Sequence, residues 1–153
     1  MVAVNASRTV QLHFDGCFAA ADRVTGITTY RAWRDTDALR LRPNGSLALG
    51  VAARCCRLIG ASPLDGELAA RRAALDSAAD PASAAAMPAA RADAAEFAAR
   101  ASAALVAAAG SRGILAGEHP QRLAREALFL LVFGSRPAIK DRLVARLTGT
   151  QPL

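Results

Sequence analysis

Two glycine-containing segments are the residues of this 153-residue chain whose types best suit ligand binding. In Gly110-Ser111-Arg112-Gly113, the backbone amides of a glycine turn can hold an anion such as pyrophosphate, and Arg112 adds a positive charge. Gly134-Ser135 interrupts an apolar segment, and such a break requires a structural or functional reason. The ordinary alternative is that each glycine ends a helix and forms the turn that follows it.

Acid–base and metal chemistry have few candidates in the chain. Glu126 lies at the rim of an apolar segment and is the best-placed carboxylate, with an ion pair to Arg122 or to another helix as the ordinary alternative. His13 and His119 are far apart in the sequence, and no pair of His or Cys residues has the spacing typical of metal ligands. We therefore expect no metal site.

The composition is that of one globular domain with a hydrophobic core. Hydrophobic residues make up 53% and charged residues 21%, which excludes an intrinsically disordered chain. The run Leu128–Phe133 is far shorter than the roughly 18–20 apolar residues that span a bilayer, so we expect no membrane segment. The adjacent Cys55 and Cys56 are expected to be buried structural thiols, which fits a reducing, cytoplasmic setting.

The net charge of +6 comes almost entirely from arginine. It divides into +4 in residues 1–60, −2 in residues 61–110 and +4 in residues 111–153. The basic residues thus form no single cluster, and no helix presents a basic face with base-reading side chains. This distribution argues against nucleic-acid binding.

Hydrophobic periodicity predicts an all-α chain preceded by one or two short strands. The predicted strands are residues 9–14 and Ile27–Trp33. After a break at Arg42–Ser46, the pattern predicts five helices in an antiparallel four-helix-type bundle. They cover about Ser46–Ile59, Ser62–Ala79, Pro88–Ala109, Pro120–Phe133 and a last segment with the stripe Ile139, Leu143, Val144 and Leu147.

This pattern divides the chain into an extended segment, residues 1–42, and a helical domain, residues 43–153. The alanine-rich helix Pro88–Ala109 predicts close approach between helix axes, because small side chains allow it. Leu128–Phe133 is apolar on every side, which predicts that it is buried all round.

The segment from Gly110 to Lys140 resembles the C-terminal domain of the acyl-CoA dehydrogenase family. Those flavoproteins carry a glycine turn, an Arg-x-x-Arg-Asp-Ala-like element and an apolar stretch that ends in Glu-Gly-Thr. The counterparts here are Gly110-Ser111-Arg112-Gly113, Arg122-Leu123-Ala124-Arg125-Glu126-Ala127 and Val132-Phe133-Gly134-Ser135. Including weaker similarity upstream to the end of the family's β domain, the resemblance spans about Leu12–Leu147.

The resemblance implies an FAD enzyme that dehydrogenates acyl-CoA thioesters and usually assembles as a tetramer. Phe133 occupies the position of the family's usual catalytic Glu and cannot accept a proton, so no catalytic residue is assigned. The family's N-terminal helical domain and nearly all of its β domain have no counterpart. Carried over by position, the cofactor contacts would be Gly110, Ser111, Arg112, Gly113, Gly134 and Ser135.

Two functional hypotheses follow from the sequence. In the first, the chain is one part of an acyl-CoA dehydrogenase-like flavoprotein, with FAD shared with a partner subunit and an acyl-CoA or acyl-carrier thioester as ligand. The partner is a second copy or an acyl-CoA dehydrogenase-like chain, and it supplies any catalytic carboxylate. In the second, the chain is a catalytically inactive helical oligomerisation or interaction domain. A nucleic-acid-binding helical protein is the third and least favoured reading.

Overall fold

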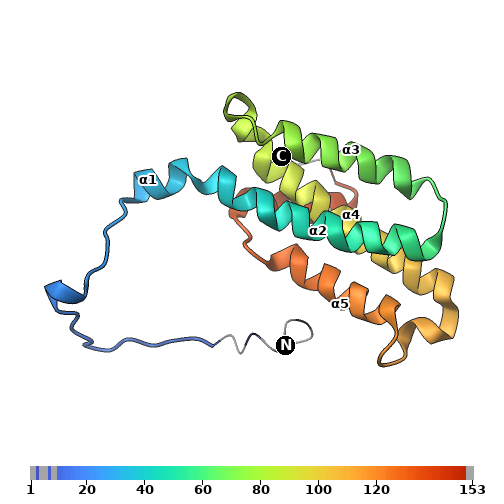
Figure 1. Cartoon of the computed structure of the whole chain (residues 1–153), viewed down its shortest axis with the longest axis horizontal. Helices are drawn as coiled ribbons and strands as arrows, with labels where there is room; N and C mark the ends of the chain where they lie inside the picture. Colours follow the sequence, from blue (N-terminus) through green and yellow to red (C-terminus); the bar gives the residue numbers. More distant parts are fainter. Residues whose placement is uncertain (1–2, 4–6, 8–9, 151–153) are drawn as a thin grey trace.

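A computed structural model of the chain describes residues 3, 7 and 10–150, and within them the protein is all-α. Five helices pack together and a sixth, short one precedes them (Figure 1), which confirms the expected helical architecture. The helices are α1 (Tyr30–Asp35), α2 (Asp37–Ile59), α3 (Leu64–Ser77), α4 (Met87–Ala109), α5 (His119–Val132) and α6 (Pro137–Thr148).

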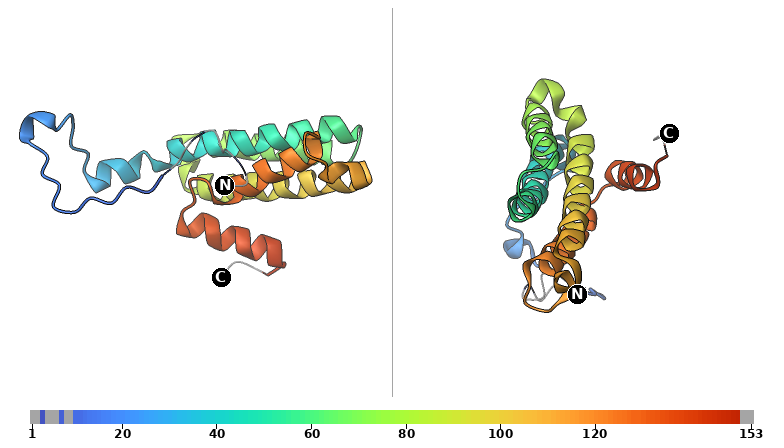
Figure 2. Two further views of the ribbon diagram at one scale, coloured as in Figure 1. Left: turned by 90° about the horizontal axis from the view of Figure 1, so that it is seen from below. Right: turned by 90° about the vertical axis from the view of Figure 1, so that its right-hand side faces the viewer.

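Helix α4 is the centre of the molecule. The helices α2 to α5 run alternately in opposite directions, and α4 contacts α2, α3, α5 and α6. Helix α6 packs on α4 to one side of the four-helix bundle (Figure 2). The side chains that α4 buries completely are mostly alanines, which let four neighbours approach one axis, while Phe97 supplies the bulk.

The predicted break at Arg42–Ser46 is wrong, because α2 begins at Asp37 and continues through this segment. Leu41 is buried, and Gly45 lies so close to α3 that an added Cβ would be 2.7 Å from a methyl carbon of Leu75. Packing against α3 therefore outweighs the helix-breaking tendency of the proline and glycine in the segment. The helix spans the expected boundary between residues 42 and 43.

The two predicted strands are not formed in the described part of the chain. Thr9 lies outside the described residues, residues 10–14 have no regular secondary structure, and Ile27–Trp33 runs into α1. A strand needs a neighbouring strand to pair its backbone, and the described residues supply none. Instead, residues 10–29 form a segment without strands, called the arm below, which leaves the bundle at α1 and bends back beneath it (Figure 1). Its one regular element is a 3-10 helix, Ala21–Arg23.

The prediction that Leu128–Phe133 is buried all round is also wrong. Leu130 faces the core, whereas Leu128 and Val132 are 54% and 68% exposed and Phe133 is 41% exposed. Helix α5 lies at the edge of the bundle, with α2 and α4 on one side of it, so only one face of the segment is covered. The apolar stripe predicted for the last helix, α6, is also only partly covered: Ile139 and Leu143 are buried, whereas Val144 and Leu147 are exposed.

Arg91 of α4 is fully buried and holds the end of α5. Its Nη2 donates hydrogen bonds to the carbonyl oxygens of Leu130, at 2.6 Å, and Phe133, at 3.0 Å. Carbonyls at a helix C-terminus have no partner within the helix, so Arg91 acts as a cap from a neighbouring helix. Burial lowers the pKa of Arg91.

An ionic network joins α3 and α6 to α4. Asp93 of α4 accepts a hydrogen bond from Arg71 of α3 at 3.2 Å, and from Nε and Nη2 of Arg142 of α6 at 2.8 Å each. The Asp93 side chain is only 14% exposed. Ile139 and Leu143 of α6 are buried in the core, so α6 is held by an apolar contact as well as by these ion pairs.

Candidate functional site

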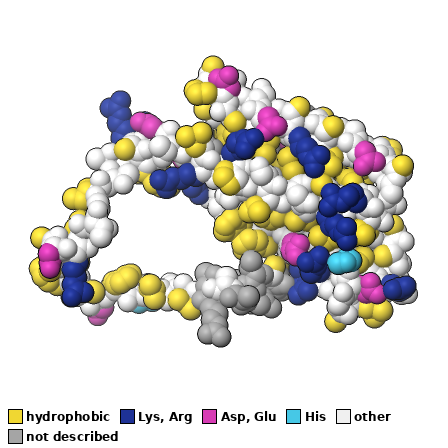
Figure 3. Space-filling model, viewed as in Figure 1, with side chains coloured by type: hydrophobic (Ala, Val, Ile, Leu, Met, Phe, Trp, Pro, Cys, Tyr) yellow, Lys and Arg dark blue, Asp and Glu magenta, His cyan; other side chains and the backbone are white. Residues whose placement is uncertain are grey.

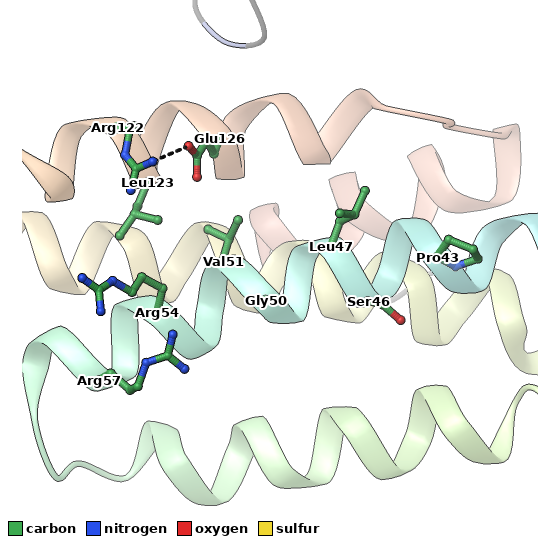
Figure 4. A pocket seen from close by; sticks show the side chains of 10 residues that line it. All are labelled: Pro43, Ser46, Leu47, Gly50, Val51, Arg54, Arg57, Arg122, Leu123 and Glu126. Carbon is green, nitrogen blue, oxygen red and sulfur yellow. Dashed lines mark ion pairs between the residues drawn. The ribbon is translucent and has the colours of Figure 1, made fainter.

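An open groove of about 680 Å³ lies between α2 and α5. Its apolar wall is formed by Leu47 and Val51 of α2 and by Leu123 of α5, and Gly50 leaves space beside them. The groove has arginines at one end, which come from both helices (Figure 4).

The register of α2 and α5 positions these arginines. Arg54 and Arg57 follow Leu47 and Val51 at intervals of three to four residues, so they share one face of α2. They stand in the last two turns of α2, where the helix dipole favours positive charge. Arg122 faces them from the first turns of α5, one residue before the buried Leu123.

The three arginines differ in how far their charge is neutralised. Arg122 forms an ion pair with Glu126, with 3.5 Å between Nη1 and Oε1 (Figure 4). Nη2 of Arg122 also lies 3.2 Å from Nδ1 of His119. This ion pair confirms the ordinary alternative for Glu126. No hydrogen bond or ion pair joins Arg54 or Arg57 to another of the described residues. The groove therefore ends in two guanidinium groups without a counter-ion in the described part of the chain.

The groups near the groove suit binding better than catalysis. Burial, together with the nearby Cys56 and Glu126, raises the pKa of Cys55 to about 11, so its sulfur is a thiol and a poor nucleophile at neutral pH. The prediction that Cys55 and Cys56 are buried is confirmed. Within the described residues, no group of three His, Cys, Asp or Glu side chains could hold a metal ion.

The predicted glycine turn, residues 110–113, lies between α4 and α5 and is part of a short 3-10 helix. Gly113 is buried, and an added Cβ would be 2.8 Å from the carbonyl oxygen of Val106. Arg112 is 76% exposed and donates to Glu118 at 2.8 Å. Helix packing thus explains Gly113, while Gly110, Ser111 and Arg112 face solvent.

Gly134 and Ser135 lie at the opposite end of α5. Fourteen helical residues separate the two predicted segments, a distance of about 21 Å. Gly134 has a φ of +63° and lies against the side chain of Asn44, so a larger residue would be excluded there. The six predicted cofactor contacts therefore form two groups at opposite ends of α5. One FAD molecule could contact both groups only if it lay along the length of α5 or if the two groups came from different chains.

The groove residues Arg54 and Arg57 were not predicted as a site from the sequence. Their spacing of three residues at the end of a helix was visible, but it is also common on solvated helix faces. What makes them part of a site is the facing helix α5, which closes the groove with Arg122 and Leu123.

The exposed apolar groups of the described surface include two sets that lie on separate parts of the molecule. The first is the arm, whose exposed large side chains are Val10, Leu12, Phe14, Phe18, Val24 and Ile27. The second is a patch at the C-terminal end of α5, formed by Leu128, Val132 and Phe133 and called the apolar patch below. Figure 3 shows hydrophobic side chains gathered near this end of α5 and along the arm.

Comparison with protein-family models, curated proteins and solved structures gives no match to this chain. The flavoprotein hypothesis therefore rests on the sequence motifs alone. Among the described residues, no helix has both the length and the apolar character needed to cross a membrane.

Proposed function

We propose that this chain is a non-catalytic helical assembly module, in which the arm of one copy packs on the apolar patch of a second copy. The exposure of the arm carries this proposal. Its six large apolar side chains are between 51% and 88% exposed, and soluble proteins seldom leave so many together in water. In a dimer with a two-fold axis, each copy would place its arm on the apolar patch of the other, so both arms and both patches would be covered.

The root of the arm is held in place by contacts to the segment between α5 and α6. Arg136, just before α6, lies over the ring of Trp33 at 5.3 Å and binds Asp37 through two hydrogen bonds of 2.7 and 3.1 Å. These contacts fix α1 against the start of α2. The arm therefore starts from a fixed point, and its exposed apolar side chains are available for contact with another molecule.

The energies are sufficient for association. Full burial of one large apolar side chain contributes about 1.5–3 kcal/mol, so six of them contribute on the order of 10 kcal/mol for each arm. The loss of translational and rotational freedom on association costs about 4–15 kcal/mol in total. Two exchanged arms, with on the order of 20 kcal/mol together at full burial, exceed this range, so partial burial is sufficient.

The solution mass tests the proposal. We expect the purified chain to be a dimer or larger at micromolar concentration by light scattering, and F14S/F18S to shift it to monomer, because both exposed rings are lost. H13S, which changes a polar residue of the arm, is the matched control and should leave the mass unchanged. L128S/V132S should also be monomeric, and mixing it with F14S/F18S should restore dimers with one intact arm–patch contact. A monomeric wild type, or an unchanged mass for F14S/F18S, refutes the proposal.

The acyl-CoA dehydrogenase-like flavoprotein subunit is the second candidate. The solvent-exposed Gly110, Ser111 and Arg112 support it, because this surface can face a partner subunit and the exposed pair of Arg112 with Glu118 can be exchanged for a contact to an anion. In this role a partner chain supplies most of the FAD site and any catalytic carboxylate, since Phe133 offers none. In an assembly of two chains, residues 110–113 of one chain and Gly134–Ser135 of the other could both approach the same FAD.

Visible absorbance distinguishes the two candidates. If the second is correct, the assembled protein retains FAD after gel filtration, and R112A lowers the retained flavin several-fold because one charged contact to the anion is lost. R31Q, on the exposed surface of α1, is the control and should retain flavin normally. If the assembled protein is colourless and does not bind added FAD, the flavoprotein candidate is wrong and the assembly role is the remaining one of the two.

A further inference from the structure

We propose that the arginine end of the α2–α5 groove binds a phosphate monoester that carries an apolar chain. This inference is independent of the assembly role, because none of its residues belongs to the arm or the apolar patch. Three observations on the groove lead to it: its unneutralised charge, its apolar wall and its length.

The charge of the groove matches a dianion. Arg122 is neutralised by Glu126, so Arg54 and Arg57 leave two positive charges at the end of the groove. A phosphate monoester carries a charge of about −1.5 to −2 at pH 7, whereas a carboxylate carries only one. Guanidinium groups also bind phosphate oxygens through paired hydrogen bonds, which suits the planar ends of Arg54 and Arg57.

The guanidinium groups, and not the backbone, must hold this anion. Arg54 and Arg57 stand at the C-terminal end of α2, where the helix dipole is negative and the free backbone groups are carbonyls. An anion there gains nothing from the helix itself. Substitution of the two arginines should therefore weaken its binding strongly, because α2 offers the anion no backbone donor there.

The wall of the groove suits an apolar chain. Leu47 is 54% exposed and points toward α5, Val51 lies between it and the arginines, and Leu123 lies at the arginine end (Figure 4). From Leu47 to Arg54 is about two helical turns, or ~10 Å along the axis. A single alkyl chain can lie along this wall while its phosphate reaches Arg54 and Arg57.

Titration calorimetry with four probes tests the proposal: octyl phosphate, octanoate, inorganic phosphate and octanol, each below its micelle concentration. We expect octyl phosphate to bind at least ten-fold more tightly than each of the others. R54Q/R57Q should weaken octyl phosphate at least ten-fold, while R31Q, which removes the same kind of charge from α1, should not. L47S should weaken octyl phosphate and leave inorganic phosphate unchanged.

Several results overturn the proposal. If octanoate binds as tightly as octyl phosphate, the groove does not select a dianionic head group. If inorganic phosphate binds as tightly as octyl phosphate, the apolar wall does not contribute to binding. Unchanged binding by R54Q/R57Q refutes the location. Arg54 is partly exposed and Arg57 is exposed, so R54Q/R57Q is expected to fold, and circular dichroism and the melting temperature verify this before titration. F14S/F18S should bind octyl phosphate like the wild type, so a failure of the assembly role leaves this test intact.

Discussion

Replacing Arg91 by alanine is expected to lower the free energy of unfolding by about 3–5 kcal/mol. The change removes two charge-assisted hydrogen bonds to the carbonyls of Leu130 and Phe133, and it leaves a cavity where a large, fully buried side chain stood. Urea unfolding followed by circular dichroism measures the effect. We also expect the end of α5 to fray, which exposes its last amides to hydrogen exchange.

R91M separates the hydrogen bonds from the volume. Methionine fills most of the space and removes a buried charge whose Nε and Nη1 have no hydrogen-bond partner among the described residues. That relief offsets part of the loss, so we expect R91M to cost about 1–2 kcal/mol, clearly less than R91A. If R91A loses less than about 1 kcal/mol, Arg91 does not cap α5 in solution.

Replacing Asp93 by alanine is expected to cost about 2–3 kcal/mol and to release α6 from α4. Asp93 is the shared acceptor for Arg71 and Arg142, so its loss leaves both guanidiniums without this partner. The pair is not fully buried, and the cost therefore falls below the 3–5 kcal/mol of a fully buried ion pair. Hydrogen exchange of the α6 amides, compared with those of α2, reports the release.

Asp76 provides the matched control. It forms an ion pair with Arg42 at 2.5 Å, but both side chains are largely exposed, so D76A is expected to cost about 0–1 kcal/mol. D93N, which keeps the shape of the side chain and removes its charge, should fall between D76A and D93A. Equal stability of D93A and D76A would show that the network contributes nothing beyond surface pairing.

The candidate site illustrates what residue patterns omit. The spacing of Arg54 and Arg57 is a local property, and so is the apolar run Leu128–Phe133. Whether each of them faces solvent, core or groove depends on which neighbours lie against α2 and α5. Periodicity carries no information on those neighbours, because the same run is buried in a central helix and half exposed in an edge helix.

The sequence by itself determined the helical class and the positions of α3 to α6, because apolar periodicity, prolines near the helix starts and glycines after the helix ends act within a few residues. Only the tertiary structure decided that α2 begins at Asp37, that the predicted N-terminal strands are replaced by an extended arm and α1, and that α5 has an open face. Each of these depends on contacts between segments far apart in the chain. Burial against α3 outweighs the local tendency of Pro43 to end a helix, and a strand cannot form without a partner to pair its backbone.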